Sequence, residues 1–226
     1  MFLKTPVVVK LGGSLLTLPD LAERLHAIVR LLHPHEALII VGGGEAADEI
    51  RRQDERCGLT ATQAHWHAIA AMTFNAEIVS RICGCLPVVS NRIDAEIAWQ
   101  HHEAVLLDAN AFLRTEQATH FRSLPESWSV TSDSIAAFVA LHWPSQQVVF
   151  CKSCDLISPD ISQICQAGLL DAWFPNLLTP LQQSDVQLRW LNLRAAIPQM
   201  QRFGHATPSS LCLFPGCDEP AGKDRD

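Results

Sequence analysis

Lys10 is the first residue of this chain whose surroundings indicate chemistry. It follows three β-branched residues at 7–9 and comes just before Gly12, Gly13 and Ser14. Glycines let backbone N–H groups approach an anion closely, and a neighbouring lysine adds a positive charge. The segment predicts a turn that binds phosphate. An ordinary tight turn after a strand is the alternative that these few residues leave open.

A second glycine turn follows a second apolar run. Residues 37–41 read ALIIV, and Gly42, Gly43 and Gly44 stand directly before an expected helix over 45–57. Three consecutive glycines cost backbone entropy, which a plain connection rarely carries. A helix N-terminus offers free N–H donors and a partial positive charge, which suit a phosphoryl group. Neither turn fits the Walker A pattern or the dinucleotide-binding fingerprint.

A third segment, TSDS, adds a carboxylate. Thr131 and Ser132 precede Asp133, and an apolar helix is expected over 132–143. In the structural interpretation, Ser132 caps this helix and Asp133 lies in its first turn. In the chemical interpretation, Asp133 lies near two cationic groups and fixes their positions around a transferring phosphoryl group.

The order and spacing of KLGGS, VGGG and TSDS resemble the motifs of the amino acid kinase superfamily, which includes aspartokinase and uridylate kinase. The resemblance covers about residues 6–175. Within the superfamily, residues 64–82 and 124–140 are most similar to one small branch. That branch contains the kinase of [5-(aminomethyl)furan-3-yl]methyl phosphate, which acts in methanofuran-type one-carbon cofactor biosynthesis.

This resemblance implies ATP as phosphoryl donor and Mg²⁺ that bridges the nucleotide phosphates with few or no protein ligands. It implies that Lys10 and Asp133 are catalytic, with Asp133 holding Lys10 in place. Residues implied to bind ATP, including the loop KSCDLIS at 152–158, are Gly12, Gly13, Ser14, Lys152 and Asp155. Residues implied to bind the acceptor are Gly42, Gly43, Gly44, Thr131 and Ser132.

One lysine of the superfamily pattern is missing. Many members carry a second catalytic lysine in a Gly-Met-x-x-Lys stretch, whereas the corresponding stretch here reads GLLDAW over 168–173. No lysine occurs between Lys152 and Lys223. Either Lys152 or an arginine substitutes, or Lys10 acts alone, or activity has been lost. Three functions stay open: a phosphomonoester kinase, a carboxylate kinase that forms an acyl phosphate, and a nucleotide-binding storage or regulatory protein.

The sequence specifies the phosphoryl acceptor less closely than the phosphoryl donor. Arg51 and Arg52 could bind a carboxylate or lie on a solvated surface, and Asp48, Asp94 and Asp108 could each bind an amine. Three aromatic side chains in the two branch-like segments could wall a flat ring, although core packing explains each of them as well: Trp66, Phe74 and Trp128. We expect a phosphate ester that carries a small cyclic or amine-bearing group.

The elements that position these residues alternate along the chain. Alternation predicts an α/β fold, a three-layer sandwich around a mostly parallel sheet of about eight strands. Lys10, the turn at Gly42 and Lys152 would then meet at the carboxyl edge of the sheet. The expected strands are 7–11, 37–41, 86–90, 104–107, 147–151, 171–174, 186–191 and 210–214. The expected helices are 20–33, 45–57, 61–83, 132–143, 160–167 and 193–202, with a further helix and a loop within 108–130.

The helix at 61–83 has an apolar stripe that is typical of a core or a subunit contact. Its members are Ile69, Met72, Ala76, Val79 and Cys83. With Trp66 and Phe74 on neighbouring faces, it predicts a homodimer that this helix helps to form.

Composition limits the partners, the location and the metal sites that we expect. The formal charge is −7 and no basic stripe is visible, which argues against nucleic acid as a partner. The absence of a signal-peptide pattern and of about 20 consecutive apolar residues favours a cytoplasmic protein with no membrane partner. The eight cysteines form no paired zinc knuckles, so we expect reduced thiols and no protein metal ligands. We expect His65 and His67 to pack or lie on a helix surface. We expect one domain over 1–215 and a flexible tail over 216–226.

Overall fold

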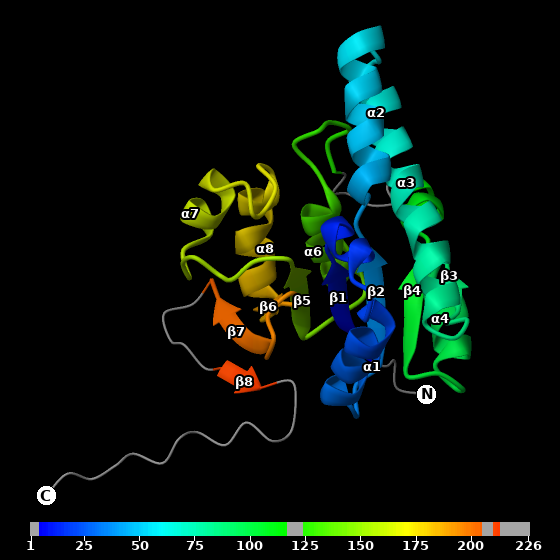
Figure 1. Ribbon diagram of the computed structural model, residues 1–226, viewed down its shortest axis with the longest axis vertical. Coiled ribbons are helices and arrows are strands. Elements are labelled where there is room, and N and C mark those ends of the chain that lie inside the picture. The colour runs from blue at the N-terminus through cyan, green and yellow to red at the C-terminus, as the bar shows by residue number, and fades with distance from the viewer. Residues whose placement is uncertain (1–4, 117–123, 205–209, 213–226) are drawn as a thin grey trace, which may run out of the picture.

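The computed structural model describes residues 5–116, 124–204 and 210–212. Its strands form one eight-stranded sheet in the order β3-β4-β2-β1-β5-β6-β7-β8 (Figure 1). They are β1 (Val7–Leu11), β2 (Ala37–Val41), β3 (Val88–Val89), β4 (Ala104–Leu107), β5 (Gln147–Lys152), β6 (Gln187–Asn192), β7 (Gln199–Phe203) and β8 (Ser210–Cys212). The first six pair in parallel, while β7 and β8 are antiparallel. The predicted fold class is confirmed.

Helices cover both faces of this sheet. They are α1 (Leu21–Leu32), α2 (Gly44–Cys57), α3 (Ala61–Ile82), α4 (Arg92–Ala98), α5 (Ala109–Glu116), α6 (Ser132–His142), α7 (Ile161–Gln166) and α8 (Leu178–Gln183). Two short 3₁₀ helices are η1 (Gly13–Thr17) and η2 (Phe174–Leu177).

The core lies in two clusters, one on each face of the sheet, because successive strand residues point to opposite sides. Val8 and Phe150 pack with α5, α6 and α8 on one face. Val9 and Val149 pack with α1 on the other. Burial on both faces explains why the central strands are continuous apolar runs. The result is the three-layer arrangement that the sequence predicts.

A helical hairpin rises above the carboxyl ends of the strands, where α2 and α3 pack against each other (Figure 1). Gly58 ends α2 with a φ of 65°, in the left-handed region that favours glycine. Thr60 then caps α3 through a capping box with Gln63. No residue of α2 is buried, so this helix is free to line a site above the sheet.

Two expected elements are wrong. Residues 171–174 are not a strand, because the side chain of Asp171 accepts the Phe174 backbone N–H at 3.0 Å and turns the chain into η2. Residues 193–202 are not a helix. Pro198, which cannot lie inside a helix, comes just before β7, and β7 pairs antiparallel with β6. Helices α4 and α8 were not expected, and the predicted tail at 216–226 lies outside the described residues.

The apolar stripe of α3 is buried inside the subunit. Ile69 and Met72 belong to one core cluster, while Ala76, Val79 and Cys83 belong to the other. The large apolar side chains that α3 leaves exposed lie on a different face, at Phe74, Ile78 and Ile82. The stripe therefore stabilises the fold, and only this second face is available for contact with another molecule.

Candidate active site

Two lysines share one face of the sheet because of strand register. Lys10 on β1 pairs with Phe150 on β5, and Lys152 lies two residues further along β5. Since side chains alternate along a strand, residues two apart point the same way. Both ammonium groups therefore reach the face covered by α6, at the carboxyl edge of the sheet.

Asp133 lies between the two lysines. Its Oδ1 atom is 3.0 Å from Lys10 Nζ and 2.8 Å from Lys152 Nζ, and its Oδ2 atom accepts a hydrogen bond from Lys152 Nζ at 2.8 Å. None of the three side chains is more than 13% exposed. The sequence analysis expected Asp133 near two cationic groups, and the structure brings Lys10 and Lys152 to it.

The charges in this centre depend on one another. Burial lowers the pKa of Lys152 to about 8, although the charge of Asp133 acts in the opposite direction. Burial tends to raise the pKa of Asp133, but the charges and hydrogen bonds of Lys10 and Lys152 outweigh it and hold this pKa below its ordinary value. Asp133 is thus a carboxylate near neutral pH, and Lys152 loses its proton in mildly alkaline solution.

The two glycine turns touch through their backbones. A Cβ atom on Gly42 would lie 2.7 Å from the Gly13 nitrogen, and one on Gly44 would lie 2.9 Å from the Gly13 oxygen. Gly44 also has a φ of 50°. Any side chain at these positions would push the turns apart. Close approach of two loops therefore requires these glycines, in addition to any contact with an anion.

Asn75 on α3 holds the second turn. It is buried, and its Nδ2 atom donates to the carbonyl oxygens of Gly42 and Gly43, each at 2.8 Å. The sequence analysis did not single out Asn75. Its one available signal was a polar residue beside Ala76, within the apolar stripe of a long helix.

The cap predicted for Ser132 is wrong. Thr131 is the N-cap residue of α6, and its side chain makes no capping bond. The carboxylate of Asp171 takes that place and accepts the Ser134 backbone N–H at 2.8 Å. Ser132 is the first residue of the helix, close to Gly42.

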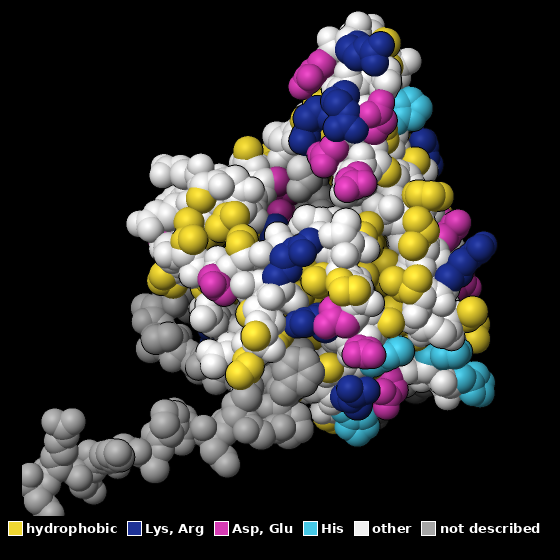
Figure 2. Space-filling model, viewed as in Figure 1, with side chains coloured by type: hydrophobic (Ala, Val, Ile, Leu, Met, Phe, Trp, Pro, Cys, Tyr) yellow, Lys and Arg dark blue, Asp and Glu magenta, His cyan; other side chains and the backbone are white. Residues whose placement is uncertain are grey.

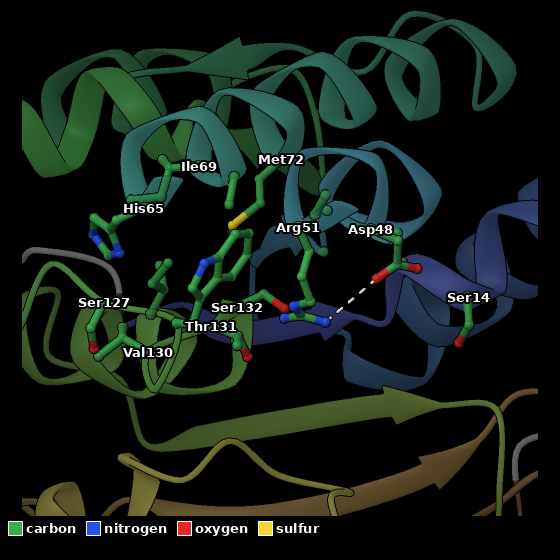
Figure 3. A pocket seen from close by; sticks show the side chains of 18 residues that line it. Ser14, Asp48, Arg51, His65, Ile69, Met72, Ser127, Val130, Thr131 and Ser132 are labelled. Atoms are coloured by element: carbon green, nitrogen blue, oxygen red, sulfur yellow. Dashed lines mark ion pairs between the residues drawn. The ribbon is translucent and has the colours of Figure 1, made fainter. Parts of the chain in front are cut away.

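A cavity of about 180 Å³ lies beside the glycine turns. Figure 3 shows Asp48 and Ser14 at one end of it and His65, Ser127 and Val130 at the other. The five predicted acceptor-binding residues all line it: Gly42, Gly43, Gly44, Thr131 and Ser132. The start of α2 therefore opens directly into a pocket.

The structure separates the charged acceptor candidates. Arg51 lines the cavity, stacks over the Trp128 ring at 4.6 Å and lies 3.7 Å from Asp48 (Figure 3). Arg52 is exposed and pairs with Glu49 on the same helix. Arg51 and Asp48 therefore stay as pocket residues, while Arg52 does not.

The other two candidate carboxylates form structural hydrogen bonds. Asp94 is bonded to Asn91 at the start of α4. Asp108 accepts from Thr73 and from the first turn of α5. Neither Asp94 nor Asp108 lines the cavity.

The three aromatic candidates have three different environments. Trp128 lines the cavity, and its Nε1 atom donates to Asp54 on α2 at 2.7 Å. Trp66 packs beside the core, under the guanidinium of Arg114. Phe74 is exposed on the outer face of α3. An aromatic wall made by all three residues is therefore wrong, and Trp128 alone of the three faces the pocket.

His65 is a pocket residue that the sequence analysis took for packing or surface. It is buried and lines the end of the cavity near Ser127. Burial lowers its pKa, against smaller raising contributions from a backbone hydrogen bond with Ser127 and from Glu126. A neutral imidazole thus contributes a polar group to a largely apolar end of the pocket.

The predicted nucleotide residues lie along the same edge of the sheet. Ser14 Oγ donates to Ser153 Oγ at 3.2 Å, which links η1 to the loop after β5. Asp155 in that loop accepts from Asn192 Nδ2 at 2.8 Å and lines a second cavity of about 90 Å³. Gly12 donates its N–H to the Cys151 carbonyl at 2.9 Å.

Among the residues whose side chains the structure describes, six cysteines are free thiols: Cys57, Cys83, Cys85, Cys151, Cys154 and Cys165. Burial raises the pKa of Cys151 to about 12 despite the charge of Lys10, so this thiol is not ionised near neutral pH. Across residues 5–116, 124–204 and 210–212, no cluster of three or more His, Cys, Asp or Glu side chains has the arrangement of a metal site. Over the same residues, no helix combines the length and apolarity needed to span a bilayer.

Comparison with known proteins decides the family. The sequence profile described as the Amino acid kinase family matches residues 5–162. The chain belongs to the amino acid kinase family. The resemblance drawn from KLGGS, VGGG and TSDS is confirmed.

One curated relative is similar to part of this chain. The [5-(aminomethyl)furan-3-yl]methyl phosphate kinase of Methanocaldococcus jannaschii is 26% identical over 151 residues. The match spans 66% of this chain and 66% of that relative, just under two thirds of its length.

Solved structures of two uridylate (UMP) kinases share the fold. Uridylate kinase from Archaeoglobus fulgidus has a TM-score of 0.58 at 17% identity, and the match covers 81% of this chain and 89% of that one. UMP kinase from Ureaplasma parvum has a TM-score of 0.60 at 16% identity, covering 86% of this chain and 92% of that one. At such identities the similarity establishes the fold alone.

Proposed function

We propose that this protein is an ATP-dependent kinase that phosphorylates a small phosphomonoester. The observation that carries the proposal is Asp133, which lies between Lys10 and Lys152 beside two touching glycine turns. Phosphoryl transfer needs positioning and charge stabilisation more than covalent participation by the protein. A buried pair of cations with a fixed counter-charge meets that need.

Each charged residue has a distinct role. Lys10 and Lys152 stabilise the negative charge on the transferring phosphoryl group, and Asp133 fixes the positions of both ammonium groups. The superfamily lysine missing from residues 168–173 is thus replaced by Lys152 on β5. Lys152 has the required proximity, since its Nζ atom lies 2.8 Å from Asp133.

ATP would supply the phosphoryl group, and Mg²⁺ would neutralise negative charge on its phosphates. We assign the backbone N–H groups of Gly13 and Ser14, which follow Lys10 closely in the chain, to the ATP phosphates. The N–H of Gly12 already donates to the Cys151 carbonyl, so Gly12 contributes to the turn and supplies no donor to ATP. The loop around Asp155 borders the 90 Å³ cavity, which we assign to the nucleotide. These groups suit phosphate oxygens, and the metal would be held by the nucleotide itself.

The cavity beside the Gly42 turn is the acceptor site in this proposal. Residues 42–44 lead into α2, whose N-terminus suits an anionic phosphate, and the guanidinium of Arg51 lines the same space. Trp128 supplies a flat apolar surface, and Asp48 supplies a carboxylate for an amine. This combination favours an acceptor such as [5-(aminomethyl)furan-3-yl]methyl phosphate, the substrate named for the relative from Methanocaldococcus jannaschii.

A carboxylate kinase is the second candidate, because Arg51 would also pair with the carboxylate of an amino acid. A nucleotide-binding protein without turnover is the third. The position of Lys152 argues against the third, since the centre holds two cations despite the missing superfamily lysine.

The deciding experiment measures ADP release with ATP and Mg²⁺ over a panel of acceptors. The panel contains [5-(aminomethyl)furan-3-yl]methyl phosphate, isopentenyl phosphate, uridine monophosphate, acetylglutamate and aspartate. We expect turnover with a phosphate ester and none with either amino acid. Turnover of an amino acid alone would support the carboxylate kinase. ATP binding without turnover of any acceptor would support the non-catalytic protein.

We also propose that the protein acts as a homodimer in the cytoplasm, where ATP is available. Helix α3 leaves Phe74, Ile78 and Ile82 exposed, and α4 leaves Ile93 and Ile97 exposed. Figure 2 shows hydrophobic side chains gathered over these two helices. Such a patch suits a second copy of the chain. Light scattering at micromolar concentration should give the mass of two chains, and a monomer mass would refute the proposal.

A further inference from the structure

Asp171 is a buried carboxylate outside the predicted set of site residues. Its oxygens accept five hydrogen bonds, from Thr131 N at 2.9 Å, Thr131 Oγ1 at 3.0 Å, Ser134 N at 2.8 Å, Ser134 Oγ at 2.5 Å and Phe174 N at 3.0 Å. Four of the five donors belong to Thr131 and Ser134, which flank Asp133 in the chain. The Asp171 carboxylate thus holds the chain on both sides of Asp133, which pairs with the two lysines.

This arrangement replaces an ordinary helix cap. Thr131 is the N-cap of α6 but uses its hydroxyl to donate to Asp171 instead of accepting from the helix. Asp171 accepts the N–H of Ser134, which is the bond that a capping side chain would normally accept. The first turn of α6 is therefore fixed by a residue 37 positions later in the chain than Ser134.

The same stretch also holds Lys152. The Leu169 carbonyl oxygen accepts a hydrogen bond from Lys152 Nζ at 2.5 Å. Residues 168–173 are the stretch in which many superfamily members carry their second lysine. Here this stretch contributes a carbonyl group that holds the lysine of β5 and a carboxylate that holds the start of α6.

We propose that Asp171 is a positioning residue, which keeps Asp133 between Lys10 and Lys152 by fixing the first turn of α6. The inference deepens the proposed function and rests on it. Both oxygens of Asp171 accept hydrogen bonds, so an asparagine would present an NH₂ group to at least one of these donors. Asp171→Asn therefore loosens the turn while keeping nearly the same volume.

Asp160 offers a matched control. Its Oδ1 atom accepts from Ser162 N at 2.9 Å and from Ser162 Oγ at 2.6 Å at the start of α7. This helix does not carry any residue of the charged centre. Asp160→Asn makes the same chemical change at a helix start, so the two variants separate loss of a cap from displacement of Asp133.

The kinetic test uses the acceptor identified by the panel. We expect Asp171→Asn to lower kcat by about tenfold to a hundredfold, as misplacement of a catalytic group by about 1 Å does, with both KM values within a few-fold. Asp160→Asn should keep its kcat within about twofold, as a surface change does. Equal kcat values for the two folded variants would overturn the proposal.

A second test needs no turnover. Lysines are labelled with acetic anhydride over a pH series and quantified by mass spectrometry, which is tractable because the chain has four lysines and Lys4 and Lys223 serve as references. Lys152 should titrate near pH 8 in the unmodified protein and in Asp160→Asn. Its midpoint should fall in Asp171→Asn, because Asp133 no longer holds its charge beside the amine.

The two tests separate the two proposals. A Lys152 midpoint that is the same in all three folded proteins would overturn the role of Asp171. A shifted midpoint in a protein that phosphorylates no acceptor would support Asp171 and contradict the kinase. If Asp171→Asn does not fold, Ser134→Ala removes one of the five donors and should shift the midpoint in the same direction by less. No shift in Ser134→Ala would then count against the proposal.

Discussion

The charged centre and the acceptor pocket meet at the glycine turns but are built in opposite ways. In the centre, Lys10, Asp133 and Lys152 are nearly excluded from water, and each lysine Nζ lies 2.8 to 3.0 Å from Asp133. In the pocket, Arg51 and Asp48 are 47% and 58% exposed, and their closest charged atoms are 3.7 Å apart. The groups assigned to chemistry are already paired and fixed, whereas those assigned to the acceptor are loosely held and open to a ligand.

Asp133→Asn should have the largest effect, because it breaks the centre at the residue that both lysines share. Removing one partner from a buried ion pair leaves an uncompensated charge and costs about 3–5 kcal/mol. We expect the free energy of unfolding, measured by denaturant titration, to fall by that amount. Asp160→Asn, which changes an exposed carboxylate, should lose far less. A similar loss in the two variants would contradict the paired centre.

Lys10→Ala should keep the fold and lower kcat by about a hundredfold or more, as loss of one donor to the transition state does. Asp133 retains Lys152 as partner in this variant, so the protein should remain folded by circular dichroism. Arg52→Ala, on the exposed side of α2, is the control and should keep normal turnover. A kcat of Lys10→Ala within a few-fold of that of the unmodified enzyme would contradict the catalytic role of Lys10.

The activity should fall in alkaline solution because Lys152 loses its proton there. The charged form of Lys152 predominates below its pKa of about 8 and is lost as the pH rises through that value. Since kcat/KM reports the ionisation of the free enzyme, it should fall above pH 8, by about tenfold for each further pH unit. Lys152→Arg keeps its charge in this range, so the pH profile of this variant should not show the fall above pH 8. If the unmodified protein and Lys152→Arg lose activity equally above pH 8, the loss belongs to another titrating group.

Arg51→Ala should have the smallest effect, because Arg51 is half exposed and screened by water. We expect the KM of the acceptor to rise about tenfold, the cost of a hydrogen bond to a charged group, with the KM of ATP unchanged. Arg52→Ala is the adjacent control and should leave both values unchanged. A rise in the KM of ATP instead would place Arg51 on the donor side.

The same contrast explains what the sequence could predict. The glycine turns and TSDS are short and contiguous, and each follows an apolar run or precedes an apolar helix, so Lys10, Gly42 and Asp133 were found from local pattern. Strand register then brought Lys152 to the same face. The predicted strands at 7–11 and 37–41 are also confirmed, because a buried parallel strand is recognisable as an apolar run.

The pocket was less predictable because segments distant in the chain build it. His65 and Trp128 face the same cavity from α3 and from the loop before α6, and no spacing rule joins positions so far apart. Asp171 is further removed, since its partners lie 37 and 40 residues earlier. The strand predicted over 171–174 contains three apolar residues after Asp171, but the carboxylate of Asp171 turns the chain at Phe174 and is itself held by the distant residues Thr131 and Ser134.

The backbone contact between Gly13 and Gly44 has a consequence for how such an enzyme can diversify. No side chain lies between these two glycines, so main-chain atoms make the contact between the turn that we assign to ATP and the turn that we assign to the acceptor. If the cavity is the acceptor site, as proposed, mutations at Arg51 or Trp128 should change the acceptor while this contact stays intact, whereas a mutation at Asn75, which holds the second turn, should disturb the contact itself. Under the proposed function, the choice of acceptor can then change with the pocket side chains while the spacing of the two turns is kept.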